Sequence, residues 1–452
     1  MSSILKIILI FIFVTNCSLP KSPKFWSKEK VTKINEIEIE IVEESRTAEN
    51  KLDQIFKKKQ ILNNEFNTKL KINLNSKSIN NIITNNYDNN DGRIDYQGDL
   101  KNISRFKFSK IKNFFQYSPE ILFDNENLIF FDANGAIFKF DTNTDLVWKK
   151  NYYSKSEQKK SPVLIFAKNK ETLIIADNIA KYYALDINTG KLLWSRKNKS
   201  PYNSQIKTFE EKFFIVDYEN ILRAYSIKDG TEIWKLQTDN ALIRSQKKLS
   251  IVVDDRNVYF NNSLGDISAV NIKTGELLWQ RPTLSLTSVD NMYSLENSEI
   301  ITDNKNLYFS NNKNNFFSIN VKTGSINWKQ EINSSLKSIL IDNYIFTVTN
   351  NGFLIITNKK SGNIIRITSL FKNKSKKFLR NKKLKDSIKP IGFLIGIKNI
   401  YLTTNKGKLY IIDILTGQTK KMLKIDNEKI SQPFINNKNL YIIKANSIIK
   451  LN

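Results

Sequence analysis

Few side chains in this chain of 452 residues have the type and spacing that chemistry needs. Cys17 is the only cysteine, and histidine is absent. That composition excludes intrachain disulfides, zinc sites of cysteine and histidine, and any catalytic base or triad that uses histidine. The remaining candidates are the Cys17 thiol, carboxylates that recur along the chain, and a formal charge of +27 from 71 basic against 44 acidic residues.

Cys17 ends an N-terminal segment that is typical of an export signal. Lys6 precedes the apolar run Ile7–Val14, which is too short to span a bilayer. The ending resembles the lipobox of bacterial lipoproteins, in which the cysteine is acylated and becomes the new N-terminus. Asn16 departs from the small residue that these proteins prefer, and Ser18 in place of aspartate implies the outer membrane. The alternative is an ordinary cleaved signal with an incidental cysteine.

The recurring carboxylates are Asp132, Asp177 and Asp217, which lie at comparable strand ends. Their recurrence indicates a structural repeat in which an aspartate caps a turn. No cluster of Asp, Asn and Glu stands out with the spacing of calcium ligands. These carboxylates are therefore expected to belong to the scaffold.

The scaffold is a repeat that begins near residue 120: an apolar strand, a turn, a second apolar strand, a turn ending in glycine, and a strand with tryptophan. Tryptophan lies four residues after the glycine in four copies, and Trp148 lies three after Asp145 of a degenerate first copy. We expect each tryptophan to pack between neighbouring repeats, because equivalent positions in every repeat cannot form one active site. Arg366 and Lys421 replace it in the last two copies and indicate a different surface there. The residues that end these turns are Asp145, Gly190, Gly230, Gly275, Gly324, Gly362 and Gly417.

A second turn lies ten residues before the first in each repeat. Its residue is glycine at 135, 265, 352 and 407 and asparagine at 220 and 314, and both residue types adopt a positive φ readily. Only Ala180 departs from this series. The repeats follow one another at intervals of roughly 40–50 residues, which is the length of a four-stranded propeller blade.

Seven complete blades leave an eighth unfinished. Leu440–Asn452 repeats the middle of a blade but lacks its outer strand, and the alternating segment Ser104–Ile111 can supply that strand. The sequence therefore predicts an all-β fold, an eight-bladed β-propeller of four-stranded antiparallel blades. N-terminal and C-terminal strands in one blade close the ring, which protects edges that an open array would expose.

We expect three parts along the chain: a signal peptide at 1–16, a lipid-anchored low-complexity tether at 17–99, and the propeller at 100–452. In the tether, Glu36–Ile41 alternates like a strand, Lys51–Leu62 has the pattern of a short amphipathic helix, and Asn80–Asp91 is typical of a loop. The tether is either a solvated spacer or a segment whose acidic and apolar strip docks on a partner.

The motif D-x-x-T-G-x-x-x-W, as in Asp186–Trp194, resembles the blades of propellers of the pyrroloquinoline-quinone type. That superfamily includes quinoprotein dehydrogenases and a non-enzymatic lipoprotein, the B subunit of the outer-membrane β-barrel assembly machinery. The lipoprotein matches better, because the resemblance covers the lipobox-like start and nearly all of residues 100–452. It implies a scaffold without a cofactor, anchored to the outer membrane by its acyl chain and facing the periplasm.

The resemblance also implies a partner and an interface. The partner is the barrel-forming subunit, bound through its periplasmic polypeptide-transport-associated domains, with the scaffold monomeric within a hetero-complex. Matching the family's interface motif places the contact at Ala241, Leu242, Ile243 and Arg244, together with Glu296 or Asp290 in the next connection between blades. An arginine with an apolar neighbour on a rigid loop is a suitable interface anchor. The alternative is that Arg244 is simply an exposed basic residue.

Two other classes of function remain as alternatives. A periplasmic quinoprotein dehydrogenase would need a cofactor cradle, a bound calcium and a catalytic carboxylate in the propeller funnel. The high positive charge favours an anionic partner, and its densest patch is Lys372–Lys389. An exported protein meets little nucleic acid, so lipid headgroups, lipopolysaccharide phosphates or an acidic partner fit this patch better, as does a solvated loop. We expect no nucleic-acid partner.

Overall fold

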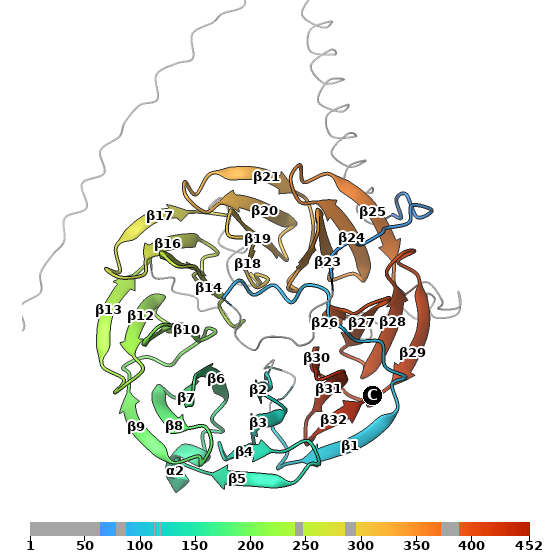
Figure 1. The fold of residues 1–452 in the computed structure, drawn as a ribbon. Helices are drawn as coiled ribbons and strands as arrows, with labels where there is room; N and C mark the ends of the chain where they lie inside the picture. The colour runs from blue at the N-terminus through green and yellow to red at the C-terminus, as the bar shows by residue number, and fades with distance from the viewer. Residues whose placement is uncertain are drawn as a thin grey trace, which may run out of the picture. The chain divides into compact units, whose positions relative to one another are not determined.

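A computed structural model describes residues 64–77, 87–112, 114, 116, 119–239, 247–284, 295–371 and 388–452. All of them belong to one compact unit, Lys59–Asn452. This unit is a ring of eight four-stranded antiparallel sheets (Figure 1), and we call the region that their innermost strands surround the central channel. The predicted eight-bladed β-propeller is therefore confirmed. Among the described residues, no helix has the length and apolar character needed to cross a membrane.

The first four blades follow one another along the chain, and each runs from its innermost to its outermost strand. The first comprises β2 (Leu122–Asp124), β3 (Asn127–Phe131), β4 (Ile137–Phe140) and β5 (Leu146–Lys150). The second comprises β6 (Leu164–Asn169), β7 (Thr172–Asp177), β8 (Lys181–Asp186) and β9 (Leu192–Lys197). The third comprises β10 (Lys207–Phe209), β11 (Lys212–Val216), β12 (Ile221–Ser226) and β13 (Glu232–Gln237). The fourth comprises β14 (Ile251–Val253), β15 (Asn257–Asn261), β16 (Ile267–Asn271) and β17 (Leu277–Arg281).

The next three blades have the same order. The fifth comprises β18 (Ile301–Thr302), β19 (Asn306–Asn311), β20 (Asn315–Asn320) and β21 (Ile326–Gln330). The sixth comprises β22 (Ile339–Ile341), β23 (Tyr344–Val348), β24 (Phe353–Asn358) and β25 (Ile364–Ser369). The seventh comprises β26 (Pro390–Ile395), β27 (Asn399–Thr404), β28 (Lys408–Asp413) and β29 (Thr419–Lys424).

The eighth blade is built from both ends of the propeller. Its inner strands are β30 (Pro433–Asn436), β31 (Asn439–Lys444) and β32 (Ser447–Leu451), and its outermost strand is β1 (Asn102–Lys107). In the pairing of β1 with β32, Ser104 lies opposite Lys450 and Phe106 opposite Ile448. The predicted closure is confirmed, with a strand that begins two residues earlier and ends four residues earlier than Ser104–Ile111.

Burial follows the position of a strand within its blade. Inner strands such as β7 are covered on both faces by the adjacent blades, so nearly every residue is buried. Outermost strands such as β9 are mostly exposed. The core consists of apolar clusters between neighbouring blades; one such cluster joins Phe214 and Leu222 of the third blade to Ile251 and Val258 of the fourth. Burial of this apolar surface is the main force that holds each blade against the next.

The repeated tryptophans lie between blades, as expected. Trp194 donates its indole N–H to the carbonyl of Ile227 at 2.9 Å, and its ring lies directly against Gly230. Gly230 has a φ of +72°, so it turns the hairpin of the third blade and leaves room for the ring. The other tryptophans of the repeat make the same contact with the following blade: Trp148 with Ile187, Trp234 with Ile272, Trp279 with Val321, and Trp328 with Lys359.

Arg366 contradicts the prediction that the loss of tryptophan marks a different surface. The side chain is fully buried and occupies the tryptophan position between the sixth and seventh blades. It donates to the carbonyl of Ile414 at 3.0 Å, the equivalent of the tryptophan contact, and to the carbonyl of Leu415. A further hydrogen bond of 2.9 Å reaches the carbonyl of Leu70, which lies before the propeller in sequence. Arginine therefore replaces tryptophan in the same role and also binds the N-terminal segment.

The recurring aspartates cap turns, as predicted. Asp177 Oδ1 accepts hydrogen bonds from the amides of Ile179 and Lys181 at 2.9 and 2.8 Å. Asp132 and Asp217 each make the equivalent pair of contacts in their own blades. Ala180, which departs from the glycine and asparagine series, nevertheless has the same left-handed backbone, with a φ of +71°.

The turn that ends in Asp145 differs in one detail from the turns that end in glycine. Its left-handed residue is Thr144, with a φ of +76°, and not Asp145. Asp141 stabilises this turn by accepting hydrogen bonds from the amides of Asn143 and Asp145 at 2.9 and 2.8 Å. Such a backbone is uncommon for a β-branched residue and carries local strain.

Part of the expected tether lies against the propeller. Residues 64–77 run along the sixth and seventh blades, where Phe66 pairs with Ile367 and the Ile72 amide donates to Leu415. Residues 87–99 pass the innermost strands of the fourth to seventh blades before they reach β1 (Figure 1). The solvated-spacer interpretation does not hold for this second stretch, since Ile94 and Tyr96 are buried. Glu36–Ile41 and Lys51–Leu62 lie outside the described residues.

Candidate functional site

The propeller has two distinct faces. Because the strands within a blade alternate in direction, the segments that join one blade to the next emerge on the same side as the aspartate-capped turns. We call this side the connection face and define it by the segments between outermost and innermost strands, such as residues 151–163 and 238–250. The opposite side carries the Thr-Gly turns, and we call it the turn face.

The predicted partner-binding residues come from two neighbouring segments of the connection face. Ala241, Leu242, Ile243 and Arg244 lie between β13 and β14, and Asp290 lies between β17 and β18; all five are outside the described residues. Glu296 is described and is exposed. Its backbone forms two hydrogen bonds with Asn312, from the Glu296 amide to Asn312 Oδ1 and from the Asn312 amide to the Glu296 carbonyl, both of 3.0 Å.

Glu296 also links the two predicted segments electrostatically. Its carboxylate attracts the ammonium group of Lys247, which lies three residues after Arg244 in the same segment. Burial nevertheless lowers the pKa of Lys247 to about 8. Glu296 has the same opposing effect on Lys429, whose pKa is also lowered by burial. The structure therefore brings Lys247 of one segment close to Glu296 of the other.

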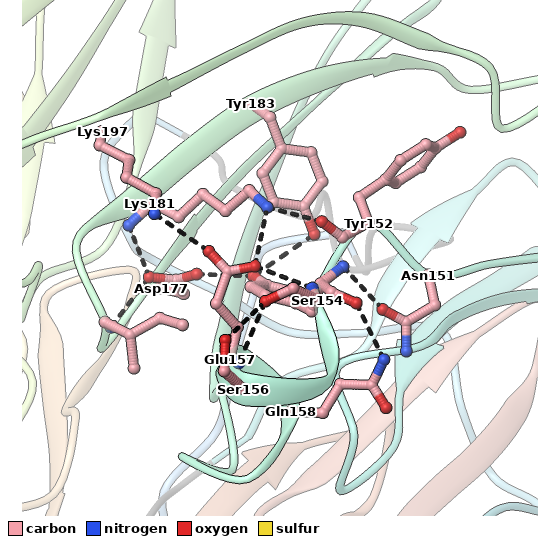
Figure 2. Close-up of polar contacts among 12 residues, drawn as sticks. Asn151, Tyr152, Ser154, Ser156, Glu157, Gln158, Asp177, Lys181, Tyr183 and Lys197 are labelled. Carbon is pink, nitrogen blue, oxygen red and sulfur yellow. Dashed lines mark hydrogen bonds and ion pairs between the residues drawn. The ribbon is translucent and has the colours of Figure 1, made fainter.

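A network of hydrogen bonds and ion pairs joins the first connection, between β5 and β6, to the second blade (Figure 2). The short helix α2 (Lys155–Gln158) begins with a capping box, in which Ser154 and Glu157 bind each other's backbone amides. Glu157 also forms ion pairs with Lys197 at 3.2 Å and with Lys181 at 3.5 Å. Burial raises the pKa of Glu157, but the hydrogen bonds from Ser154 and Lys197 outweigh it and lower the pKa to about 2.

The buried centre of this network is a carboxylate. The Tyr153 hydroxyl donates to Asp177 Oδ2 at 2.6 Å, and burial raises the pKa of Asp177. Because Asp177 Oδ1 caps the turn after β7, both carboxylate oxygens have partners. The network fixes the shape of the first connection and resembles a structural support more than a catalytic centre.

The central channel holds a second cluster of charges, which the repeat pattern in the sequence did not predict. Its members precede or begin the innermost strands of five blades: Glu120, Lys207, Lys248, Glu299 and Lys337. Lys248 and Glu120 form an ion pair of 2.6 Å although their blades are the fourth and the first, so this pair spans the channel. Glu299 is surrounded by lysines, whose charges lower its pKa against the effect of burial.

The channel also contains the chain's own segment Tyr87–Asp91. Asn89 is only 3% exposed and binds residues of three blades, and Asp91 forms an ion pair of 2.5 Å with Lys337. The charged residues of the channel do not stand out in the repeats, because the residue type at the start of the innermost strand differs from blade to blade. The available signal in the sequence was a lysine or glutamate at the start of a short apolar strand. Within the described part of the chain, no three His, Cys, Asp or Glu side chains form a group that could hold a metal.

The closed ring, its four-stranded blades and the tryptophan between them define the class of protein. The chain is an eight-bladed propeller of the pyrroloquinoline-quinone type. Residues 133–368 match the family model described as outer membrane protein assembly factor BamB, and the chain belongs to that family. No curated protein matches the chain in sequence.

Solved structures agree with this fold. BamB from Moraxella catarrhalis superposes with a TM-score of 0.61 at 16% identity, over 78% of this chain and 100% of that one. A europium-containing methanol dehydrogenase has a TM-score of 0.57 at 14% identity, over 80% and 88% of the two chains. The quinohemoprotein alcohol dehydrogenase from Comamonas testosteroni has a TM-score of 0.55 at 12% identity, over 79% and 78%. At such low identities these likenesses concern the fold alone.

Proposed function

We propose that the chain is a non-enzymatic scaffold lipoprotein of the outer-membrane β-barrel assembly machinery. It binds the periplasmic domains of the barrel-forming subunit and aids insertion of outer-membrane proteins. Membership of the BamB family is the observation that carries this proposal. The lipobox-like ending at Cys17 supports an acyl anchor in the outer membrane, on the periplasmic side.

The interface in this proposal lies on the connection face of the third to fifth blades. Arg244 and Ile243 provide a charged and an apolar contact, and Glu296 or Asp290 provides a carboxylate from the next segment. Two observations support this choice. Glu296 is exposed on this face, and its carboxylate interacts with Lys247, three residues after Arg244.

The contents of the channel favour the scaffold over the alternative, a periplasmic quinoprotein dehydrogenase. A dehydrogenase of this superfamily would hold its cofactor in the funnel. In this chain, Tyr87–Asp91 and the Lys248–Glu120 ion pair occupy the channel. Analysis of the purified protein for bound quinone and for calcium discriminates the two functions, and stoichiometric quinone would favour the enzyme.

The interface is tested by Arg244→Glu in the full chain. We predict a surface loop at Arg244, where charge reversal should change stability little, and binding to the periplasmic domains should weaken by about 2 kcal/mol if Arg244 is a hot spot. Arg256→Glu is the matched control, because Arg256 is an exposed arginine on the turn face of the fourth blade. Titration of the purified barrel-forming subunit measures both variants. Equal affinities of Arg244→Glu and wild type would remove Arg244 from the interface.

The anchor is tested separately. Cys17→Ser removes the acceptor thiol, so we expect a soluble periplasmic protein or an uncleaved precursor in place of a membrane-bound one. Fractionation of the envelope and mass spectrometry of the N-terminal peptide provide the measurement. Unchanged membrane fractionation of the variant, together with a wild-type N-terminal peptide that carries no lipid, would contradict acylation of Cys17.

A further inference from the structure

The segment Tyr87–Asp91 is bound in the channel in the manner of a peptide ligand. Two inner strands donate backbone hydrogen bonds to it: the Val253 amide to the carbonyl of Tyr87 and the Thr302 amide to the carbonyl of Asp88, both at 3.0 Å. The Tyr87 ring contacts Phe209 of the third blade edge to face, with centroids 5.9 Å apart. These contacts hold the segment at the ends of β10, β14 and β18.

Asn89 is the most completely bound residue of the segment. Its Nδ2 group donates to the carbonyls of Ile251 at 3.0 Å and Ile300 at 2.9 Å. Gln205 Oε1 and Ser250 Oγ lie at 3.1 and 3.2 Å from the same nitrogen. Lys207 Nζ donates to Asn89 Oδ1 at 2.5 Å. All these partners belong to the ring, so the pocket that receives Asn89 is a feature of the propeller itself.

This arrangement selects asparagine. Lysine is only a donor, so the oxygen of the amide faces Lys207 and its nitrogen faces the two carbonyls. Aspartate has nearly the same shape but would direct a second oxygen at those carbonyls. The backbone adds to the selectivity, because Asn89 has a φ of +56° and asparagine accepts this conformation more readily than most residues.

The next two residues are recognised through their side chains as well. Asn90 binds Leu340 with both ends of its amide: Nδ2 donates to the Leu340 carbonyl at 3.2 Å and Oδ1 accepts from the Leu340 amide at 2.9 Å. Asp91 forms its ion pair with Lys337 of the same blade. Groups on four blades thus bind the three consecutive side chains of Asn89, Asn90 and Asp91.

We propose that the channel of this propeller is a peptide-recognition site for a short segment with the sequence Asn-Asn-Asp in a turn conformation, and that residues 87–91 fill it in cis. Lys207 is 1% exposed, which places the specificity for the first asparagine deep in the ring. The site goes beyond the proposed scaffold function and does not depend on it. The groups of the site bind the backbone carbonyls, the side-chain amides and the carboxylate of a polypeptide, and the ligand we propose is a peptide and not a redox cofactor.

The experiment vacates the site and offers the ligand in trans. In the full chain, residues 87–92 are replaced by a Gly/Ser sequence of equal length. A fluorescent, end-capped peptide with the sequence of residues 87–94 should bind this variant and not the wild type, whose site is filled. The same peptide with aspartate in place of Asn89 should bind at least roughly tenfold more weakly, because the carboxylate cannot donate to the two buried carbonyls that Asn89 binds. No binding to a folded variant, or equal binding of both peptides, would overturn the proposal.

A second measurement applies if the substituted protein does not fold. Asn89→Asp in the full chain should lower the melting temperature by several degrees and speed hydrogen exchange at the amides of Val253 and Thr302. Asn188→Asp, at an exposed turn position, is the control and should change neither. An Asn89→Asp protein with wild-type melting and exchange would show that the segment is only a linker.

Discussion

The residue that best defines the channel is Lys207, a lysine buried at the start of an innermost strand. Burial lowers its pKa to about 8, although the carboxylate of Glu299 opposes this effect. Its ammonium group donates a hydrogen bond to Asn89 Oδ1 and is also attracted by Glu120. A buried lysine with a lowered pKa destabilises the folded protein when it is protonated, so its titration should be visible in the stability of the ring.

The pH dependence of unfolding tests this description of Lys207. The pKa of Lys207 is lower in the folded protein than its ordinary value of 10.5, so between these two pH values the unfolded chain binds more protons. The free energy of unfolding should therefore rise with pH in this interval, by about 2 kcal/mol between about pH 8 and pH 10. Lys207→Met should lack this component, and the difference between the two denaturant titration series isolates it. Parallel pH profiles would mean that Lys207 titrates normally.

At the scale of the element, each of the first five blades packs against the next through a tryptophan and a glycine. The indole of Trp234 donates to the carbonyl of Ile272, and its ring covers Gly275. A Cβ atom on Gly275 would lie 2.7 Å from the ring, so the glycine is required both by its φ of +77° and by this contact. The motif that marks the repeat in the sequence is therefore the physical contact between blades.

The contact between tryptophan and glycine predicts that two glycine substitutions lower the free energy of unfolding by different amounts. Gly275→Ala should lower the free energy of unfolding by about 2–4 kcal/mol, because a left-handed alanine and an overpacked ring are both unfavourable. Gly92→Ala is the matched control: its φ is +61°, but a Cβ there meets no atom within 4 Å. We expect a loss of about 1 kcal/mol for the control. Equal losses in chemical denaturation would mean that the contact with Trp234 adds nothing.

Repetition also explains how far sequence reasoning could reach. Turn glycines and tryptophans recur in register, so they predict the blade, the number of blades and the contact between them. Arg366 could not be recognised as a substitute for tryptophan, because its partners Ile414 and Leu70 meet only in the folded ring. Asn89 and Lys207 were missed for a related reason: they lie 118 positions apart and belong to no repeat. The predicted interface residues Arg244 and Asp290 remain predictions.

At the scale of the whole molecule, the ring is closed in two ways. The first is the pairing of β1 with β32, which completes the eighth blade. The second is the segment that precedes β1, since residues 87–99 contact successive blades from the third to the seventh before they reach the eighth. A propeller buries its apolar surface only between blades, so a ring that opens at one junction exposes two blade faces at once. Both contacts therefore hold closed the junction at which the chain enters the ring.

A disulfide across β1 and β32 tests this closure directly. Ser104 and Lys450 are opposite each other in the antiparallel register, where Cα atoms lie roughly 4.5–5.5 Å apart, a separation that a disulfide spans. In a Cys17→Ser background, Ser104→Cys with Lys450→Cys should form an intramolecular disulfide under mild oxidation. That link should raise the melting temperature, because it prevents the ring from opening between the ends of the propeller. Ser104→Cys with Asn188→Cys is the control, since Asn188 lies on the second blade and should not react. A Ser104–Lys450 pair that remains reduced in the folded protein would mean that β1 does not occupy the outer edge of the eighth blade.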